Sequence, residues 1–93
     1  MKIHVQYTAQ LRTVVGHAEE LVDVADGASL AELLAHLAAR QPDVGPHLVT
    51  NTGEIRPSLL MAVNGTAVPR NAAGAALLHE GDVVALLPPI AGG

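Results

Sequence analysis

The sequence contains no cysteine, no tryptophan and no phenylalanine, and Tyr7 is its only aromatic residue. Without cysteine, the chain can form no disulfide, thiolate metal site or side-chain thioester. Its few basic residues form no run or stripe, so we expect no nucleic-acid partner. No apolar run approaches the roughly 20 residues that a membrane span needs, and the first residues alternate in polarity instead of forming a secretory signal. We therefore predict a cytoplasmic protein without a membrane segment.

Aliphatic residues and alanine are abundant instead, and 49% of the 93 residues are hydrophobic. That content is enough for one small globular domain. Ile3, Val5 and Tyr7 alternate with polar residues, which predicts a half-buried strand over residues 2–8. Gly16 marks a turn, and residues 20–24 are expected to form a second strand that pairs with the first.

The clearest local signal is that of a helix after Asp26-Gly27. Ser29 followed by Glu32 has the spacing of a capping box. One apolar stripe of an amphipathic helix follows, made of Leu30, Leu33, Leu34 and Leu37. Pro42 should end the helix, because proline cannot continue the hydrogen-bond ladder.

The second half of the chain predicts a loop over residues 42–58, with a short helical turn near 47–49, and then more strands. Residues 59–63 lead into Asn64-Gly65, a strong hairpin signal, and the chain returns through residues 66–68. Residues 83–87 are the last strand. This order predicts an α+β domain over residues 1–87 with the β-grasp arrangement, in which one main helix packs on one face of a mixed four- to five-stranded sheet.

Two of these strands, residues 59–63 and 83–87, are unbroken apolar runs, as is typical of strands covered on both faces. A single helix covers only one face. We therefore expect an exposed apolar surface around Leu60, Ala62 and Leu87 that binds a protein partner. The alternatives are that the loop 42–58 folds over this face, or that small alanines leave little exposed apolar surface there.

The last six residues, Pro88, Pro89, Ile90, Ala91, Gly92 and Gly93, are predicted to form a flexible tail. Fully extended, such a tail reaches roughly 20 Å, far enough to carry the Gly93 carboxylate into the active site of another protein. Glycines without a Cβ suit a narrow channel and leave the last carbonyl open to attack. A carboxylate needs activation, most simply by ATP. Sulfur attack would then give a thiocarboxylate, and attack by a lysine amine an isopeptide.

The chain resembles the ubiquitin-like sulfur-carrier family, and within it the small subunit of molybdopterin synthase. The resemblance covers nearly the whole chain, and its most specific part is the ending over residues 80–93, with Pro88-Pro89 and Gly92-Gly93. The other matching segments are residues 9–16, 29–40 and 60–66.

The resemblance implies a cycle in which an E1-like adenylating enzyme activates Gly93 with ATP and a sulfurtransferase supplies the sulfur. The resulting thiocarboxylate would insert into the large subunit of molybdopterin synthase, in a hetero-oligomer, during molybdenum cofactor biosynthesis. It also implies that a basic residue at Arg12 contacts a partner, although a solvated loop charge is equally consistent with the sequence.

Other fates remain open at this point. The carrier could feed another acceptor, such as cysteine or a thio-metabolite, or act as a ubiquitin-like modifier of lysines, or be an interaction domain with an incidental Gly-Gly ending. The five histidines are scattered, so we expect neither a metal site nor a bound cofactor. No nucleophile, acid and base are assembled, and we do not expect catalysis by this chain alone.

Overall fold

The computed structural model describes residues 1–87 of the chain, and its centre is a five-stranded sheet with the strand order β2-β1-β5-β3-β4. Strand β1 (Lys2–Tyr7) pairs antiparallel with β2 (Glu19–Asp23) and parallel with β5 (Val83–Leu87). Strand β3 (Leu60–Val63) lies antiparallel to β5, and the short β4 (Thr66–Ala67) follows at the edge. This mixed sheet confirms the predicted α+β architecture.

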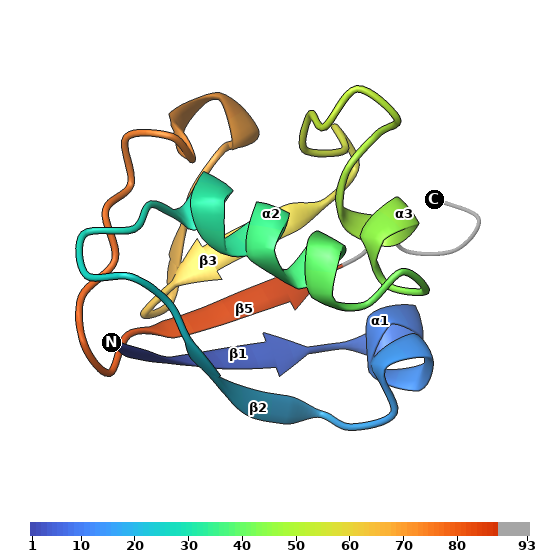
Figure 1. Ribbon diagram of the computed structural model, residues 1–93, viewed down its shortest axis with the longest axis horizontal. Coiled ribbons are helices and arrows are strands. Elements are labelled where there is room, and N and C mark those ends of the chain that lie inside the picture. Colours follow the sequence, from blue (N-terminus) through green and yellow to red (C-terminus); the bar gives the residue numbers. More distant parts are fainter. Residues whose placement is uncertain (88–93) are drawn as a thin grey trace.

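Helix α2 (Leu30–Arg40) crosses one face of the sheet (Figure 1). The predicted capping box is confirmed: the Ser29 hydroxyl accepts from the Glu32 backbone N–H, and the Glu32 carboxylate accepts from the Ser29 backbone N–H, both at 3.1 Å. The chain leaves the helix at Gln41, directly before Pro42.

The core lies between α2 and the sheet. The four leucines of the predicted stripe and their main partners on the sheet are all fully buried: Leu30, Leu33, Leu34, Leu37, Ile3, Val5, Val84 and Leu86. From the sequence we also expected Val63 to face the helix within this core, and the structure confirms this only in part. Its register with Val84 places it on the helix side, but near the edge of the sheet it stays half-buried, and Met61 is the buried residue of that strand.

A second helix, α1 (Ala9–Val15), was not predicted. It packs at the ends of β1 and β5 and buries Leu11, while Val14 and Val15 pack against the same core. Gly16 ends it in a left-handed conformation with φ 95°, which a glycine adopts without steric cost. The helix is stabilised by this burial, since Thr8 provides no side-chain cap.

The segment 42–58 lies on the helix side of the sheet. It contains the short helix α3 (Gly45–Leu48), close to the predicted turn at 47–49, and α3 contacts α2. Val44 and Leu48 are buried there, so the alternative in which this segment covers the opposite face is wrong. A 3-10 turn, η1 (Arg70–Ala72), follows β4. Within residues 1–87, no helix has the length and apolarity needed to cross a membrane.

Candidate functional site

The candidate site is on the sheet face that points away from α2, which we call the open face. Because side chains alternate along a strand, the apolar runs of β3 and β5 supply both faces. Met61, Val84 and Leu86 point to the core, whereas Leu60 pairs with Leu87 and Ala62 with Ala85 on the open face.

Four of these side chains, Leu60, Ala62, Ala85 and Leu87, form what we call the apolar patch. Leu60 is 61% exposed, and the other three are half-buried. Covering a leucine that is exposed to this degree, together with its apolar neighbours, lowers the free energy of the system. Such a surface is therefore suited to bind a partner. Leu60, Ala62 and Leu87, the three patch residues predicted as partner contacts, therefore lie together.

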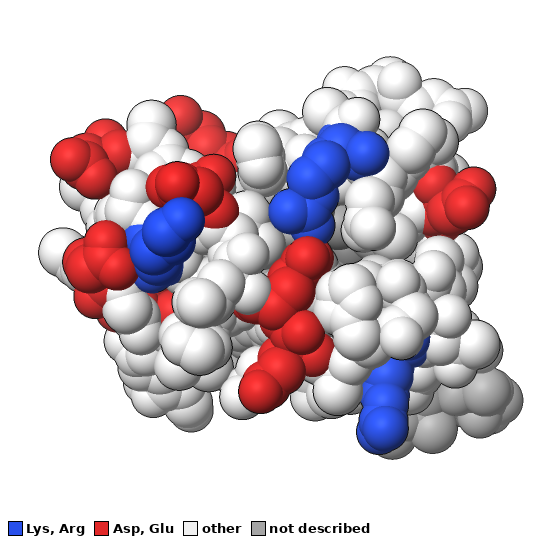
Figure 2. All heavy atoms as spheres, turned by 60° about the horizontal axis from the view of Figure 1, so that its bottom comes forward, with Lys and Arg blue, Asp and Glu red and all other residues white. Residues whose placement is uncertain are grey.

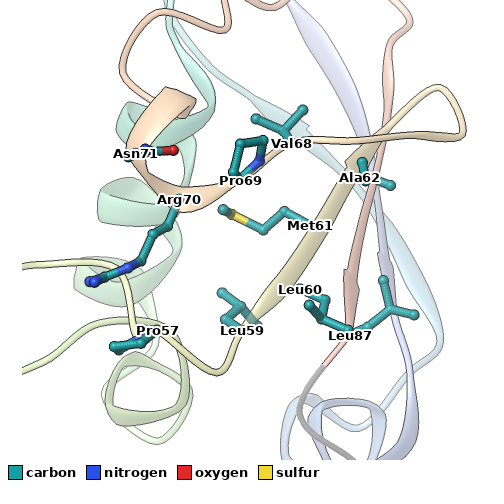
Figure 3. Close-up of a pocket in the computed structure, with 11 residues that line it drawn as sticks. Pro57, Leu59, Leu60, Met61, Ala62, Val68, Pro69, Arg70, Asn71 and Leu87 are labelled. Atoms are coloured by element: carbon teal, nitrogen blue, oxygen red, sulfur yellow. The ribbon is translucent and has the colours of Figure 1, made fainter.

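A groove of about 690 Å³ opens beside the patch (Figure 3). Leu60, Ala62 and Leu87 line it together with the buried Leu59 and Met61. Its walls come from two other segments and include Pro57, Val68, Pro69, Arg70 and Asn71. Leu87 is both a groove residue and the last described residue, so the groove adjoins the point at which the chain continues into residues 88–93.

Arg12 is exposed on α1 and does not line the groove. It lies toward the same end of the sheet, because α1 packs at the end of β5 and the Thr8 hydroxyl donates to the Leu86 carbonyl at 3.2 Å. The predicted reactive residue Gly93 and the tail residues 88–92 lie outside the described residues.

Acidic groups cluster at the opposite end, where β1 and β5 begin. Lys2 forms an ion pair with Asp23 at 3.1 Å, and the terminal amine lies 3.4 Å from both Asp23 and Asp26. Figure 2 shows Asp and Glu side chains gathered at the left end around one basic side chain. Hydrogen bonds from the Asn64 side chain and the His79 backbone N–H hold the pKa of Asp82 below its ordinary value. These carboxylates pair with neighbouring charged or hydrogen-bonding groups in turns and at strand ends, and so have a structural role.

One polar cluster lies at the edge of the core. Glu20 accepts hydrogen bonds from the Tyr7 hydroxyl and the Arg40 guanidinium, both at 2.5 Å, and His17 lies 3.5 Å from its other oxygen. Although burial favours the neutral acid, these bonds lower the pKa of Glu20. Burial, followed by the bond to Glu20, raises the pKa of Tyr7. Both pKa shifts favour the forms present at neutral pH, the protonated Tyr7 hydroxyl and the ionised Glu20 carboxylate. The hydrogen bonds from Tyr7 and Arg40 to Glu20 therefore hold β1, β2 and α2 together.

No group of three or more histidine or acidic side chains within residues 1–87 is arranged to hold a metal ion. The sequence pattern did not indicate Pro57, Pro69 and Arg70 as residues of this groove. They come from segments without a regular pattern, and only the three-dimensional arrangement brings them beside β3.

Comparison with known proteins supplies the family. The family model described as the ThiS family matches residues 5–93, nearly the whole chain and including Gly93. The chain belongs to the ThiS family. It is thereby identified as a member of the ubiquitin-like sulfur carriers, as its ending indicated.

Two relatives of this ThiS-family chain illustrate the range of roles. It is 31% identical to the small archaeal modifier protein 3 of Haloferax volcanii and 33% identical to the molybdopterin synthase sulfur carrier subunit of Chlamydomonas reinhardtii. Both matches cover all of this chain and all of the relative.

Two solved structures of similar proteins support the same assignment. The SAMP1 crystal structure from Haloferax volcanii superposes with a TM-score of 0.88 at 28% identity, with full coverage of both chains. A chain of the Amycolatopsis orientalis BexX/CysO complex superposes with a TM-score of 0.71 at 29% identity, covering 98% of this chain and 99% of the other. These likenesses support the β-grasp, ubiquitin-like assignment of the fold.

Proposed function

We propose that this ThiS-family chain carries sulfur as a thiocarboxylate on Gly93 and donates it as the small subunit of molybdopterin synthase. The observation that carries the proposal is the family match, which continues through Gly93. The structure adds that β5 leads directly from the apolar patch into residues 88–93. A partner that covers the patch would therefore receive the tail at the same time.

The chemistry of the proposed cycle has two steps. The Gly93 carboxylate attacks the α-phosphate of ATP, pyrophosphate leaves, and an acyl-adenylate forms. Sulfide supplied through a sulfurtransferase then attacks the activated carbonyl, AMP leaves, and the thiocarboxylate remains. If the nucleophile is instead a persulfide on the sulfurtransferase, AMP leaves and an acyl disulfide forms, and a thiol then cleaves its S–S bond to release the thiocarboxylate and form a disulfide with the sulfurtransferase. The chain has no cysteine, so its side chains offer no alternative sulfur site as a persulfide or thioester.

Residues 1–87 and 88–93 have separate tasks in this proposal. The folded domain presents the apolar patch to an adenylating enzyme and to the large subunit, with Arg12 as a second contact, while the tail enters each active site. The requirement for ATP suits a cycle in the cytoplasm. A sulfur carrier of this kind needs no bound metal or cofactor of its own, and the catalytic groups belong to the partners.

One relative gives a second candidate function. The 31% identity to a protein named as a small modifier favours attachment of Gly93 to lysines of target proteins. The same adenylated intermediate serves both fates, because only the attacking nucleophile differs. A carrier that feeds cysteine or a thio-metabolite would also share it.

The test is conversion of the full chain by its cognate adenylating enzyme with ATP and a sulfur source, followed by intact-mass measurement. We expect one oxygen to be replaced by one sulfur in the wild type and no change after deletion of Gly93. Thermal unfolding should be the same for both proteins, as a control for folding. Undiminished conversion of the Gly93 deletion would refute the proposal.

The acceptor is tested separately with the thiocarboxylate form. Sulfur transfer to a pterin precursor in the presence of a molybdopterin synthase large subunit supports the first function. Transfer that occurs only to a cysteine precursor, or isopeptide adducts on target proteins, would assign the chain to one of the other two fates.

A further inference from the structure

The outer edge of β2 is an open boundary of the sheet, separate from the groove beside the apolar patch. The strand order places β2 at one end of the sheet, with β1 and β5 between it and β3. In Figure 1 this strand forms the lower border of the molecule. Figure 2 brings that border forward and shows acidic side chains near its middle. An edge strand offers backbone donors and acceptors to a further strand.

The hydrogen bonds to β1 determine which residues of β2 face outward. The Val24 N–H donates to the Met1 carbonyl at 3.0 Å. Beyond the other end of β2, the Tyr7 N–H donates to the Ala18 carbonyl at 2.7 Å. Bonded and unbonded pairs alternate along an antiparallel ladder, and both bonded positions on this side, 18 and 24, are even. The residues of β2 that direct their N–H and C=O groups away from β1 are therefore Glu19, Leu21 and Asp23.

The side chains of these three residues give the edge a chemical character. Leu21 lies at the centre and is 58% exposed. Glu19 is exposed, forms no ion pair among residues 1–87, and lies opposite the neutral Gln6. Asp23 is already paired with Lys2. The edge therefore presents an apolar side chain next to an acidic side chain that has no basic neighbour on β1.

The other side chains of β2 hold the strand in place. Val22 is buried in the core, and Glu20 accepts hydrogen bonds from the Tyr7 hydroxyl and the Arg40 guanidinium. The outward groups of β2 are therefore fixed in position before any partner arrives. A surface that is ordered in advance loses less conformational entropy on binding.

We propose that this edge receives an extended segment of a partner protein as a further antiparallel strand, with an apolar residue beside Leu21 and a basic residue beside Glu19. Backbone hydrogen bonds supply the affinity of such strand addition, and alternate side chains supply its specificity. Antiparallel pairing is the more stable per residue. It sets the order of the segment from its N-terminus: an apolar residue, any residue, a basic residue.

This inference goes beyond the proposed function. Because β1 and β5 separate β2 from β3, a partner strand at this edge leaves Leu60 and Leu87 uncovered. The chain could therefore be held by one protein at β2 while its apolar patch contacts another.

A second copy of this chain fits the edge less well. Symmetric pairing of two β2 strands about Leu21 would place Glu19 of each copy opposite Asp23 of the other. Like charges directly opposite each other destabilise a strand pair, and the two-fold symmetry produces this contact twice. A basic residue in a partner segment meets Glu19 with the opposite charge, so charge complementarity favours the partner segment.

The experiment follows the isotope-labelled full chain by NMR during titration with a short peptide of threonine and valine that carries one leucine and, two residues later, one arginine. We expect the amide signals of Glu19, Leu21 and Asp23 to shift and their hydrogens to exchange more slowly. The amide signals of Leu60 and Leu87 should stay unchanged.

Two N-methylated peptides test the backbone pairing without altering the protein. Methylation at the peptide leucine removes the N–H that faces β2 and should weaken binding roughly tenfold, the scale of one lost hydrogen bond with the added steric cost. Methylation at the residue between leucine and arginine is the matched control. That N–H points away from β2, so the dissociation constant should not change.

A charge exchange tests the basic position. Glu19→Lys should bind the leucine–arginine peptide roughly tenfold more weakly and should instead bind a peptide with glutamate in place of the arginine. Glu54→Lys makes the same charge change on the exposed segment 42–58 and should leave both affinities at their wild-type values. Thermal unfolding of both variants checks that the domain is intact.

The inference is overturned if the β2 amides do not respond to the peptide, if the two N-methylated peptides bind equally, or if Glu19→Lys keeps the wild-type preference. A wild-type dimer in sedimentation that forms through β2 would also overturn it. None of these measurements uses the adenylating enzyme. Their failure therefore leaves the proposed function standing, and a chain that is not adenylated leaves this inference standing.

Discussion

The two faces of the sheet are built from the same strands and yet differ in how far their apolar side chains are buried. On the helix side, Val84 and Leu86 of β5 are fully buried under α2. On the open face, Leu87 of the same strand stays half-buried beside Leu60, which is 61% exposed. An unbroken apolar run in a small domain can therefore serve two purposes, because alternate residues build the core and a surface for a partner.

The largest difference between the faces should appear in stability. Leu34→Ala removes a fully buried side chain from the helix side and should lower the free energy of unfolding by about 2–5 kcal/mol. Leu60→Ala on the open face should change it by less than about 0.5 kcal/mol. Urea unfolding of both variants provides the measurement. Equal losses would mean that the open face belongs to the core.

For binding to the adenylating enzyme, a substitution on the open face should have the larger effect. Leu60→Asp puts a charge into the apolar patch and should weaken binding to the adenylating enzyme roughly tenfold or more, with the domain still folded. Leu77→Asp is the matched control, since Leu77 is 59% exposed but does not line the groove. Isothermal titration calorimetry measures both. If the two variants bind equally well, the patch has no role in docking.

A substitution on the helix side should lower the stability of the domain without changing binding at the open face. Ser29→Ala removes the acceptor for the Glu32 N–H and should lower stability by about 1 kcal/mol. Binding of the folded variant to the adenylating enzyme should be unchanged, because Ser29 is buried on the helix side. Chemical denaturation and titration of the same sample check both parts. A loss of affinity in the folded protein would contradict the separation of the two faces.

The smallest effect should be a dependence on pH. The bonds from Tyr7 and Arg40 lower the pKa of Glu20 in the folded protein below its ordinary value of 4.5. Its contribution to stability is therefore complete above that value and is lost as the pH falls through the folded pKa. Glu20→Gln should lower the melting temperature at pH 7, and the difference from the wild type should shrink as the pH falls below about 4.5.

The matched control for this prediction is Glu19→Gln. Glu19 is the neighbouring exposed acid, and it forms no ion pair among residues 1–87. Melting curves between about pH 3 and pH 7 compare the two variants with the wild type, a range that spans the ordinary pKa of a glutamate. A difference for Glu20→Gln that persists unchanged at the acid end would show that the carboxylate charge is not what matters.

Features with local causes could be predicted from the sequence. The Ser29 capping box, the leucine stripe of α2 and the Asn64-Gly65 turn each act within a few residues, and all three are present in the structure. Taken together, these local features were enough to predict the sheet and its open face.

Features that depend on distant segments could not be predicted in this way. Helix α1 is only seven residues long and forms because Leu11 is buried by the ends of β1 and β5. Its apolar residues at 11, 14 and 15 were a faint helical signal that short length makes ambiguous. The groove is less predictable still, since Pro57, Arg70 and Leu87 meet there from three separate parts of the chain.

In the proposed function, the sulfur is carried at the end of the tail and not on the folded domain. The most direct measurement is fragmentation mass spectrometry of the wild-type chain after reaction with its adenylating enzyme, ATP and a sulfur source. We predict that every fragment containing Gly93 has one sulfur in place of one oxygen, and that fragments ending before Gly93 are unmodified. Sulfur found on any fragment from residues 1–92 would contradict the proposed role of Gly93.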